Sequence, residues 1–96
     1  MLERLRLEDF LPHVGSEIDV SAYGREGRFT LKEAGPIKSP SPRDSQPFHL
    51  VLSAPNDWRL PQGLYRVQHP QLGTLELFTV PIGPDGSAFC YEVIFN

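Results

Sequence analysis

The C-terminal third of the chain alternates between short apolar segments and sharp turn signals. Residues 64–69, 74–80 and 88–95 are rich in apolar and aromatic side chains, and the segments between them, residues 70–73 and 81–86, carry proline and glycine. Proline cannot donate to a strand ladder, and glycine adopts the positive φ angles of tight turns, so these residues end strands at defined points. Residues 60–96 therefore predict an antiparallel three-stranded meander.

The preceding part of the chain shows the same alternation more weakly. Residues 18–22, 29–31 and 48–52 alternate between apolar and polar side chains, which predicts three further half-buried strands. Residues 24–27 contain two glycines and predict a hairpin turn, residues 35–47 form a loop rich in proline and serine, and residues 54–59 form a second loop. Six short strands predict an all-β fold, a strongly bent antiparallel barrel or roll of the Sm-like or SH3-like kind.

One short helix is expected before the first strand, at about residues 8–13. Its acidic first turn, Glu8 and Asp9, suits the positive end of a helix dipole, and Gly15 ends it. The expected apolar face consists of residues three and four apart: Leu7, Phe10, Leu11 and Val14. We expect this helix to cover one end of the β structure.

Length and charge restrict the class of protein. A chain of 96 residues predicts one domain over residues 1–96, and 40% hydrophobic with 22% charged residues is ordinary for a globular protein. The net charge of −3 gives no general attraction for nucleic acid or anionic membranes. The charged N-terminus does not resemble a signal peptide, and no apolar run is long enough to span a membrane, so we expect a cytoplasmic protein.

The residue types that carry chemistry are few and scattered. His13, His49 and His69 lack the spacing of metal ligands, and Cys90, the single cysteine, lies in the middle of a predicted strand. A cysteine there usually behaves as a small buried apolar residue. No nucleophile or phosphate-binding motif is present in the sequence. We therefore expect no enzyme activity, no cofactor and no metal.

The last two predicted strands are apolar on both faces. Such a strand is either enclosed in a core or lies in an interface. The first functional hypothesis is therefore an interaction or assembly module that pairs with a protein partner or with itself through strand edges, most simply as a homo-oligomer. Its candidate interface residues are Phe78, Val80, Phe89, Tyr91, Val93 and Phe95.

The alternative hypothesis is binding of RNA or another single-stranded nucleic acid. Small barrels bind single strands with aromatic platforms and basic grooves. Trp58 and Tyr65 are the candidate stacking residues, with Phe78 and Tyr91 as further aromatics, and Arg59 and Arg66 could contact phosphates. Twelve acidic residues outnumber nine basic ones, which weakens this hypothesis.

The turn and core signals taken together resemble a family of short bacterial proteins known only as a domain of unknown function. The resemblance covers about the whole chain, with Phe10 and Gly15 as its weaker N-terminal part. It is carried by residues 60–65, 69–70, 72–73, 80–81, 91–92 and 95–96, with Phe78 and Gly83. It implies a fold and a bacterial origin but no activity. Members are sometimes associated with phage-tail-like genes, which implies a structural or accessory role in such an assembly.

A short helix followed by bent antiparallel strands also resembles the Sm-like small barrel. Sm-like RNA binders carry an Asp and an Asn in one turn and an Arg-Gly pair in another. The corresponding turns here are residues 70–73 and 84–86, and the sequence contains no Arg-Gly dipeptide. This resemblance implies a fold and not an RNA-binding site.

Overall fold

The computed structural model describes residues 5–37 and 47–95. Most of the predicted loop at residues 35–47 lies outside these ranges. A short helix, α1 (Leu7–Phe10), continues as a 3₁₀ turn, η2 (Leu11–His13). The strands are β1 (Glu17–Ala22), β2 (Arg25–Pro36), β3 (Phe48–Pro55), β4 (Gly63–His69), β5 (Gly73–Asp85) and β6 (Ala88–Phe95). In neither described range is there a helix long and apolar enough to cross a membrane.

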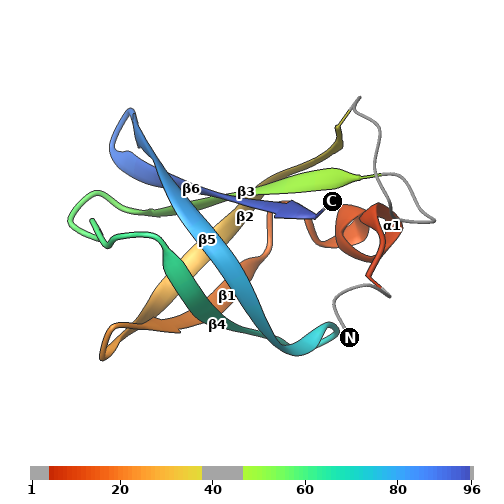
Figure 1. The fold of residues 1–96 in the computed structure, drawn as a ribbon, viewed down its shortest axis with the longest axis horizontal. Coiled ribbons are helices and arrows are strands. Elements are labelled where there is room, and N and C mark those ends of the chain that lie inside the picture. The colour runs from red at the N-terminus through yellow and green to blue at the C-terminus, as the bar shows by residue number, and fades with distance from the viewer. Residues whose placement is uncertain (1–4, 38–46, 96) are drawn as a thin grey trace.

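The six strands form a closed antiparallel barrel, which confirms the prediction of a six-stranded antiparallel barrel or roll (Figure 1). The strand order around the barrel is β1-β2-β3-β6-β5-β4. Two long strands are each shared between two neighbours. β2 pairs with β1 up to Thr30 and with β3 from Thr30 onward, while β5 pairs with β4 up to Thr79 and with β6 from Val80. Register shifts occur in both long strands, and such bulges bend a strand strongly enough to close a small barrel.

Two turns differ from the sequence prediction. Ala22 pairs with Arg25, so the first hairpin turns at Tyr23 and Gly24, both with positive φ, and not over residues 24–27. Such a two-residue turn matches the twist of its strands. β5 continues to Asp85 through the predicted turn at residues 81–86, because Gly83, with a φ of 118°, accommodates the bulge inside the strand. Likewise β2 continues to Pro36, into the predicted loop.

An aromatic cluster closes one end of the barrel. Phe10 of α1 packs against Phe48 and Phe95, with ring centroids 5.7 Å apart in both cases. In Figure 1, α1 lies at this end, beside the C-terminal end of β6. The helix prediction is confirmed, but Leu11 and Val14 are exposed, because a 3₁₀ turn that begins at Leu11 and contains Pro12 changes the side-chain period.

The opposite end is closed by the loop between β3 and β4. Trp58 lies over Gly27 of β2, where an added Cβ would be 2.4 Å from the indole ring. The buried Tyr91 hydroxyl donates to the Trp58 carbonyl and accepts from the Leu60 N–H, at 3.0 Å. The Tyr65 hydroxyl donates to the Pro61 carbonyl at 2.7 Å. Burial raises the pKa of Tyr65, which keeps this hydroxyl protonated as a donor. Two tyrosines therefore fasten this loop to the core.

Candidate interaction surface

Of the six predicted interface residues, three belong to the core. Tyr91, Val93 and Phe95 are buried inside the barrel, so they are not available to a partner. Phe89 is half-buried, and the Arg59 guanidinium lies 4.9 Å from its ring centroid. Val80 is also half-buried, and Phe78 is exposed. Barrel closure gives every strand two neighbours, which corrects the expectation of pairing through free strand edges.

The residues predicted to contact nucleic acid do not form an accessible platform. Trp58 and Tyr65 are buried, so neither ring can stack on a base. Arg66 forms an ion pair with Glu76 at 3.2 Å, and Arg59 donates to Asn56 through two nitrogens. The aromatic and basic groups that the hypothesis combined therefore lie apart, in the core and in local side-chain contacts.

Two large apolar side chains lie side by side on the outside of the barrel. Leu64 of β4 and Phe78 of β5 occupy directly opposed positions in the ladder and are 66% and 51% exposed. Their neighbours in sequence, Tyr65 and Leu77, are buried and also opposed. Since side chains alternate along a strand, Leu64 and Phe78 must both face outward.

Tyr23, in the turn between β1 and β2, is held against the start of β4. Its hydroxyl donates to the Gln62 carbonyl at 2.6 Å, and a Cβ added to Gly63 would lie 2.5 Å from that hydroxyl. Gly63 shares its face of β4 with Tyr65, whose ring centroid lies 6.3 Å from that of Tyr23, so the Tyr23 ring lies on the side of β4 away from Leu64, although 58% of the residue is exposed. We call the exposed pair Leu64 and Phe78 the outer patch.

A shallow groove of about 310 Å³ runs along one side of the outer patch, between the end of β1 and β4. Glu76 of β5, two residues before Phe78 on the same face of that strand, lines it as well. The ion pair of Arg66 and Glu76 forms its polar wall. Its lining residues are Ser21, Ala22, Gly24, Leu64, Tyr65, Arg66 and Glu76.

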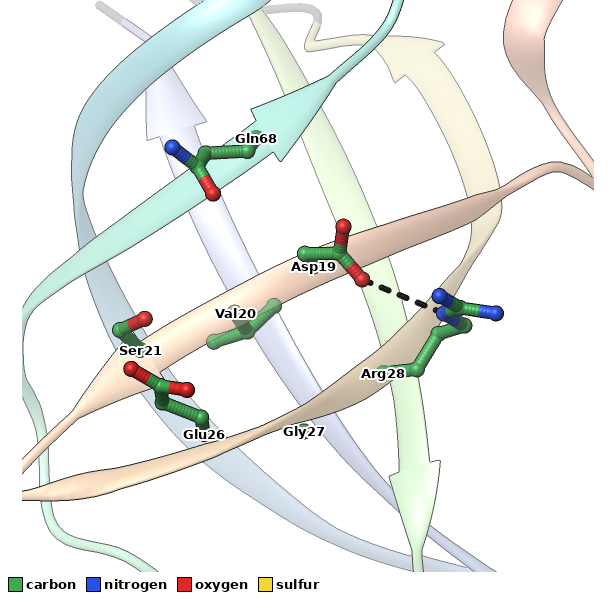
Figure 2. Close-up of a pocket in the computed structure, with 7 residues that line it drawn as sticks. All are labelled: Asp19, Val20, Ser21, Glu26, Gly27, Arg28 and Gln68. Carbon is green, nitrogen blue, oxygen red and sulfur yellow. Dashed lines mark hydrogen bonds and ion pairs between the residues drawn. The ribbon is translucent and has the colours of Figure 1, made fainter.

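A second, polar groove of about 420 Å³ crosses the outer face of β1 and shares Ser21 with the first (Figure 2). Its cation, Arg28, is paired with Asp19 at 3.2 Å and with Glu17 at 3.4 Å. The hydrogen bond to Asp19, with the charges of both acids, raises the pKa of Arg28. Asp19 and Glu26 also line the groove, so its charge does not favour a phosphate.

A serine hydroxyl and a histidine ring lie within hydrogen-bond distance, but the histidine nitrogen facing the serine carries a proton and cannot activate the serine as a nucleophile. The Ser16 hydroxyl lies 3.2 Å from Nε2 of the buried His69, whose Nδ1 accepts from the backbone N–H groups of Gln71 and Leu72. Because Nδ1 is the acceptor, the ring hydrogen is on Nε2, which donates to Ser16. His69 therefore cannot accept the serine proton as a general base would.

The same contacts show what His69 does. The Ser16 hydroxyl donates a hydrogen bond to the His13 carbonyl at 2.6 Å, and the ring centroids of His13 and His69 lie 4.5 Å apart. Burial, and secondly the nearby His13, lowers the pKa of His69, which favours the neutral ring. His69 is therefore a structural link between η2 and the turn after β4.

The other two candidate residues, His49 and Cys90, also lie in structural positions. His49 lies between Glu92, at 2.9 Å, and Glu33, at 3.5 Å, on the outside of the barrel. Cys90 is a free, buried thiol, in line with the expectation from its position in a strand. Among residues 5–37 and 47–95, no group of three or more His, Cys, Asp or Glu side chains is arranged to hold a metal ion.

Sequence reasoning missed Leu64, although one signal was available. In β4, Tyr65 and Val67 have the phase of the buried face, so Leu64 falls on the same face as Arg66 and Gln68. An apolar residue out of phase in this way marks an exposed position.

Comparison with known proteins agrees with the resemblance seen in the sequence. The curated proteins and the solved structures provide no match to the chain. One protein family, described as Domain of unknown function (DUF6916), matches residues 5–95. That range includes the whole barrel, from α1 to the end of β6. Because the match covers nearly the full sequence, the chain belongs to this family of domains of unknown function, DUF6916.

Proposed function

We propose that this protein is a non-enzymatic interaction or assembly module that binds a protein partner through the outer patch. The observation that carries the proposal is the directly opposed pair Leu64 and Phe78, both more than half exposed. Single exposed apolar residues are common on protein surfaces, whereas larger contiguous apolar surface is rare on monomers and generally marks an interaction site.

The surroundings of the patch support the same function. Interfaces typically combine an apolar centre with a polar rim, and aromatic residues are enriched in them. Phe78 provides an aromatic group, and Arg66 with Glu76 provides a rim that carries both charges. The barrel core does not need the patch, because its interior is filled by Tyr65, Leu77 and their neighbours. The setting that we propose is a larger assembly of the phage-tail-like kind.

The test is a comparison of cross-linked complexes from the native host. A tagged wild-type chain is cross-linked in cells and purified, and its partners are quantified by mass spectrometry. The double variant Leu64→Glu, Phe78→Glu places two carboxylates in the outer patch. The matched control is Ile82→Glu, because Ile82 lies in the bulge of β5 and is 52% exposed, as Phe78 is 51% exposed. We expect the partner set to survive the control and to be lost with the double variant.

Two results would contradict the proposal. One is a partner set unchanged in the double variant while the protein stays folded by circular dichroism. The other is tight binding of single-stranded RNA that weakens steeply with salt, since phosphate contacts release counterions. The second result would favour the nucleic-acid alternative, which would then need a surface other than the buried Trp58 and Tyr65.

A further inference from the structure

We infer that His69, Ser16 and His13 form an acid-sensitive latch, which holds α1 and η2 against one end of the barrel and releases them when His69 is protonated. This end is the one closed by Phe10, so the inference is independent of the outer patch. In Figure 1, α1 and the turn between β4 and β5 lie at the same end of the barrel. His69 is the last residue of β4 and lies where η2 and this turn meet.

The N-terminal segment, residues 7–14, has few polar attachments to the strands. Among the described residues, no hydrogen bond or ion pair joins residues 7–14 directly to a strand side chain or backbone group. The link is Ser16, whose hydroxyl donates to the His13 carbonyl at 2.6 Å and lies 3.2 Å from Nε2 of His69. Apart from this link, apolar packing such as that of Phe10 holds the segment in place.

The latch requires a neutral His69 ring. Nδ1 accepts from the N–H groups of Gln71, at 3.0 Å, and Leu72, at 3.3 Å. A proton on Nδ1 would face these two donors, so both hydrogen bonds would be lost. The residue is only 6% exposed, and a charge held there without a partner is costly. The His13 ring lies against it, so the charged ring reaches water when η2 moves aside.

No negative charge in the surroundings compensates a protonated His69. The group that faces it from η2 is His13, and the turn at residues 70–72 carries no charged side chain. The acidic residues near η2 in sequence are engaged elsewhere or exposed: Asp9 accepts from the Arg6 N–H, Glu17 pairs with Arg28, and Glu8 is exposed. Burial, and secondly His13, lowers the pKa of His69, so the latch is closed above the ordinary value of about 6.5 and opens as the pH falls below it.

Release of the segment uncovers an aromatic surface. Phe10 packs against Phe48 and Phe95, whose buried rings are stacked with centroids 4.4 Å apart. The Gly15 N–H donates to the Leu31 carbonyl of β2 at 2.7 Å, which limits the movement to the residues before it. A helix as short as α1 is not stable alone in water, so its hydrogen bonds break when it leaves the barrel. Acid therefore converts a closed end of the barrel into an open, apolar one.

Amide hydrogen exchange of the whole chain, followed by NMR at about pH 7.5 and about pH 5 and corrected for the intrinsic exchange rates, measures this opening. The reporters are the N–H groups of Leu11, Val14 and Ser16, which donate to carbonyls of residues 7–13. Their protection should fall by up to about thirtyfold, the limit reached when only the open form binds the proton with the ordinary histidine pKa. At both pH values they should be less protected than the amides of β3 and β6, because the segment opens without the barrel.

Three variants assign the response to the latch. His69→Gln removes the titrating ring, so reporter protection should no longer change with pH. His49→Gln is the matched control, because His49 is a partly buried histidine on the outside of the barrel, between Glu33 and Glu92. It should keep the wild-type response. Ser16→Ala breaks the link and leaves His69 in place, so reporter protection should already be low at about pH 7.5.

Three results would overturn the latch. One is reporter protection in the wild type that is the same at both pH values. Another is a pH response in His69→Gln as large as that of the wild type. The third is reporter protection equal to that of β3 and β6, which would mean that the segment opens only with the whole barrel. Should His69→Gln fail to fold, a Ser16→Ala chain that keeps full reporter protection at about pH 7.5 would overturn it instead.

Discussion

Replacing Tyr91 with phenylalanine removes one oxygen from the centre of the barrel and tests how the β3–β4 loop is held. The hydroxyl donates to the buried Trp58 carbonyl and accepts from the partly buried Leu60 N–H at 3.0 Å. Phenylalanine keeps the ring and its contact with Phe29, whose centroid lies 5.5 Å away. The substitution therefore isolates the two hydrogen bonds from the packing.

The expected cost follows from leaving those two backbone groups without a partner. A buried carbonyl left unsatisfied costs about 1–3 kcal/mol, and the less buried N–H less, so we expect a loss of about 2 kcal/mol in unfolding free energy. A chain of 96 residues has a total stability of about 5–14 kcal/mol, so the loss is substantial. It corresponds to a decrease of about 8–16 °C in Tm.

Two other tyrosines form a graded series of controls. Tyr65→Phe loses one partly buried bond to the Pro61 carbonyl, for which we expect about 1 kcal/mol. Tyr23→Phe loses an exposed bond to the Gln62 carbonyl, with an expected cost within about 0.5 kcal/mol. The series thus ranks the three hydroxyls by the burial of their hydrogen bonds.

The assay is urea unfolding followed by tryptophan fluorescence. Trp58 is the only tryptophan and lies in the loop under test, so its signal reports on the affected region. Circular dichroism of the strands should give the same midpoint if unfolding is two-state. A Tyr91→Phe variant that loses less stability than Tyr23→Phe would refute the reasoning, because burial of the two bonds would then not determine their contribution.

Three further predictions concern the core and its titratable groups. Gly27→Ala should destabilise the fold by about 1–3 kcal/mol, because the new Cβ collides with Trp58, whereas Gly35→Ala, with its nearest contact at 3.4 Å, should be nearly neutral in the same urea assay. Lowering the pH from about 7.5 to about 5 should reduce the free energy of unfolding, because the pKa of His69 is lower in the folded protein than in the unfolded chain. The stability that the neutral His69 ring contributes is present above the unfolded pKa of about 6.5 and is lost as the pH falls toward the folded pKa. A His69→Gln variant whose urea midpoint keeps the wild-type pH dependence would contradict this assignment. Cys90 should react with a thiol reagent only as fast as the folded protein opens, and rapid modification under native conditions would count against its burial.

Much of the architecture could be predicted from local sequence. Alternation of apolar and polar residues indicated β1, the middle of β2, β3 and β4, and proline and glycine separated the strands. These signals are local, because the strand period and the turn dihedrals depend on a few consecutive residues. These signals failed where a strand continues past proline and glycine residues, as β5 does at Gly83. At that point the glycine forms a β-bulge within the strand instead of a turn that ends it.

The candidate site could be predicted only in part, for the same reason. Phe78 was among the predicted interface residues, and its exposed position fits that hypothesis, whereas Tyr91, Val93 and Phe95 lie in the core. A strand that is apolar on both faces does not itself specify which face meets the interior. That depends on pairing with strands distant in sequence, such as β6 with β3, and on closure of the barrel.

Strand β5 shows what the sequence determined and what the tertiary structure determined. The sequence alone determined that residues 74–80 form a strand with two apolar faces. The tertiary structure determined that the face with Leu77 points inward, where Leu77 lies opposite Tyr65. The same orientation buries Thr79 completely and leaves Phe78 exposed. Because side chains alternate strictly along a strand, Thr79 faces the interior together with Leu77. The buried Thr79 hydroxyl donates a hydrogen bond to the Leu77 carbonyl at 3.0 Å. Phe78 was thereby left on the surface, beside Leu64.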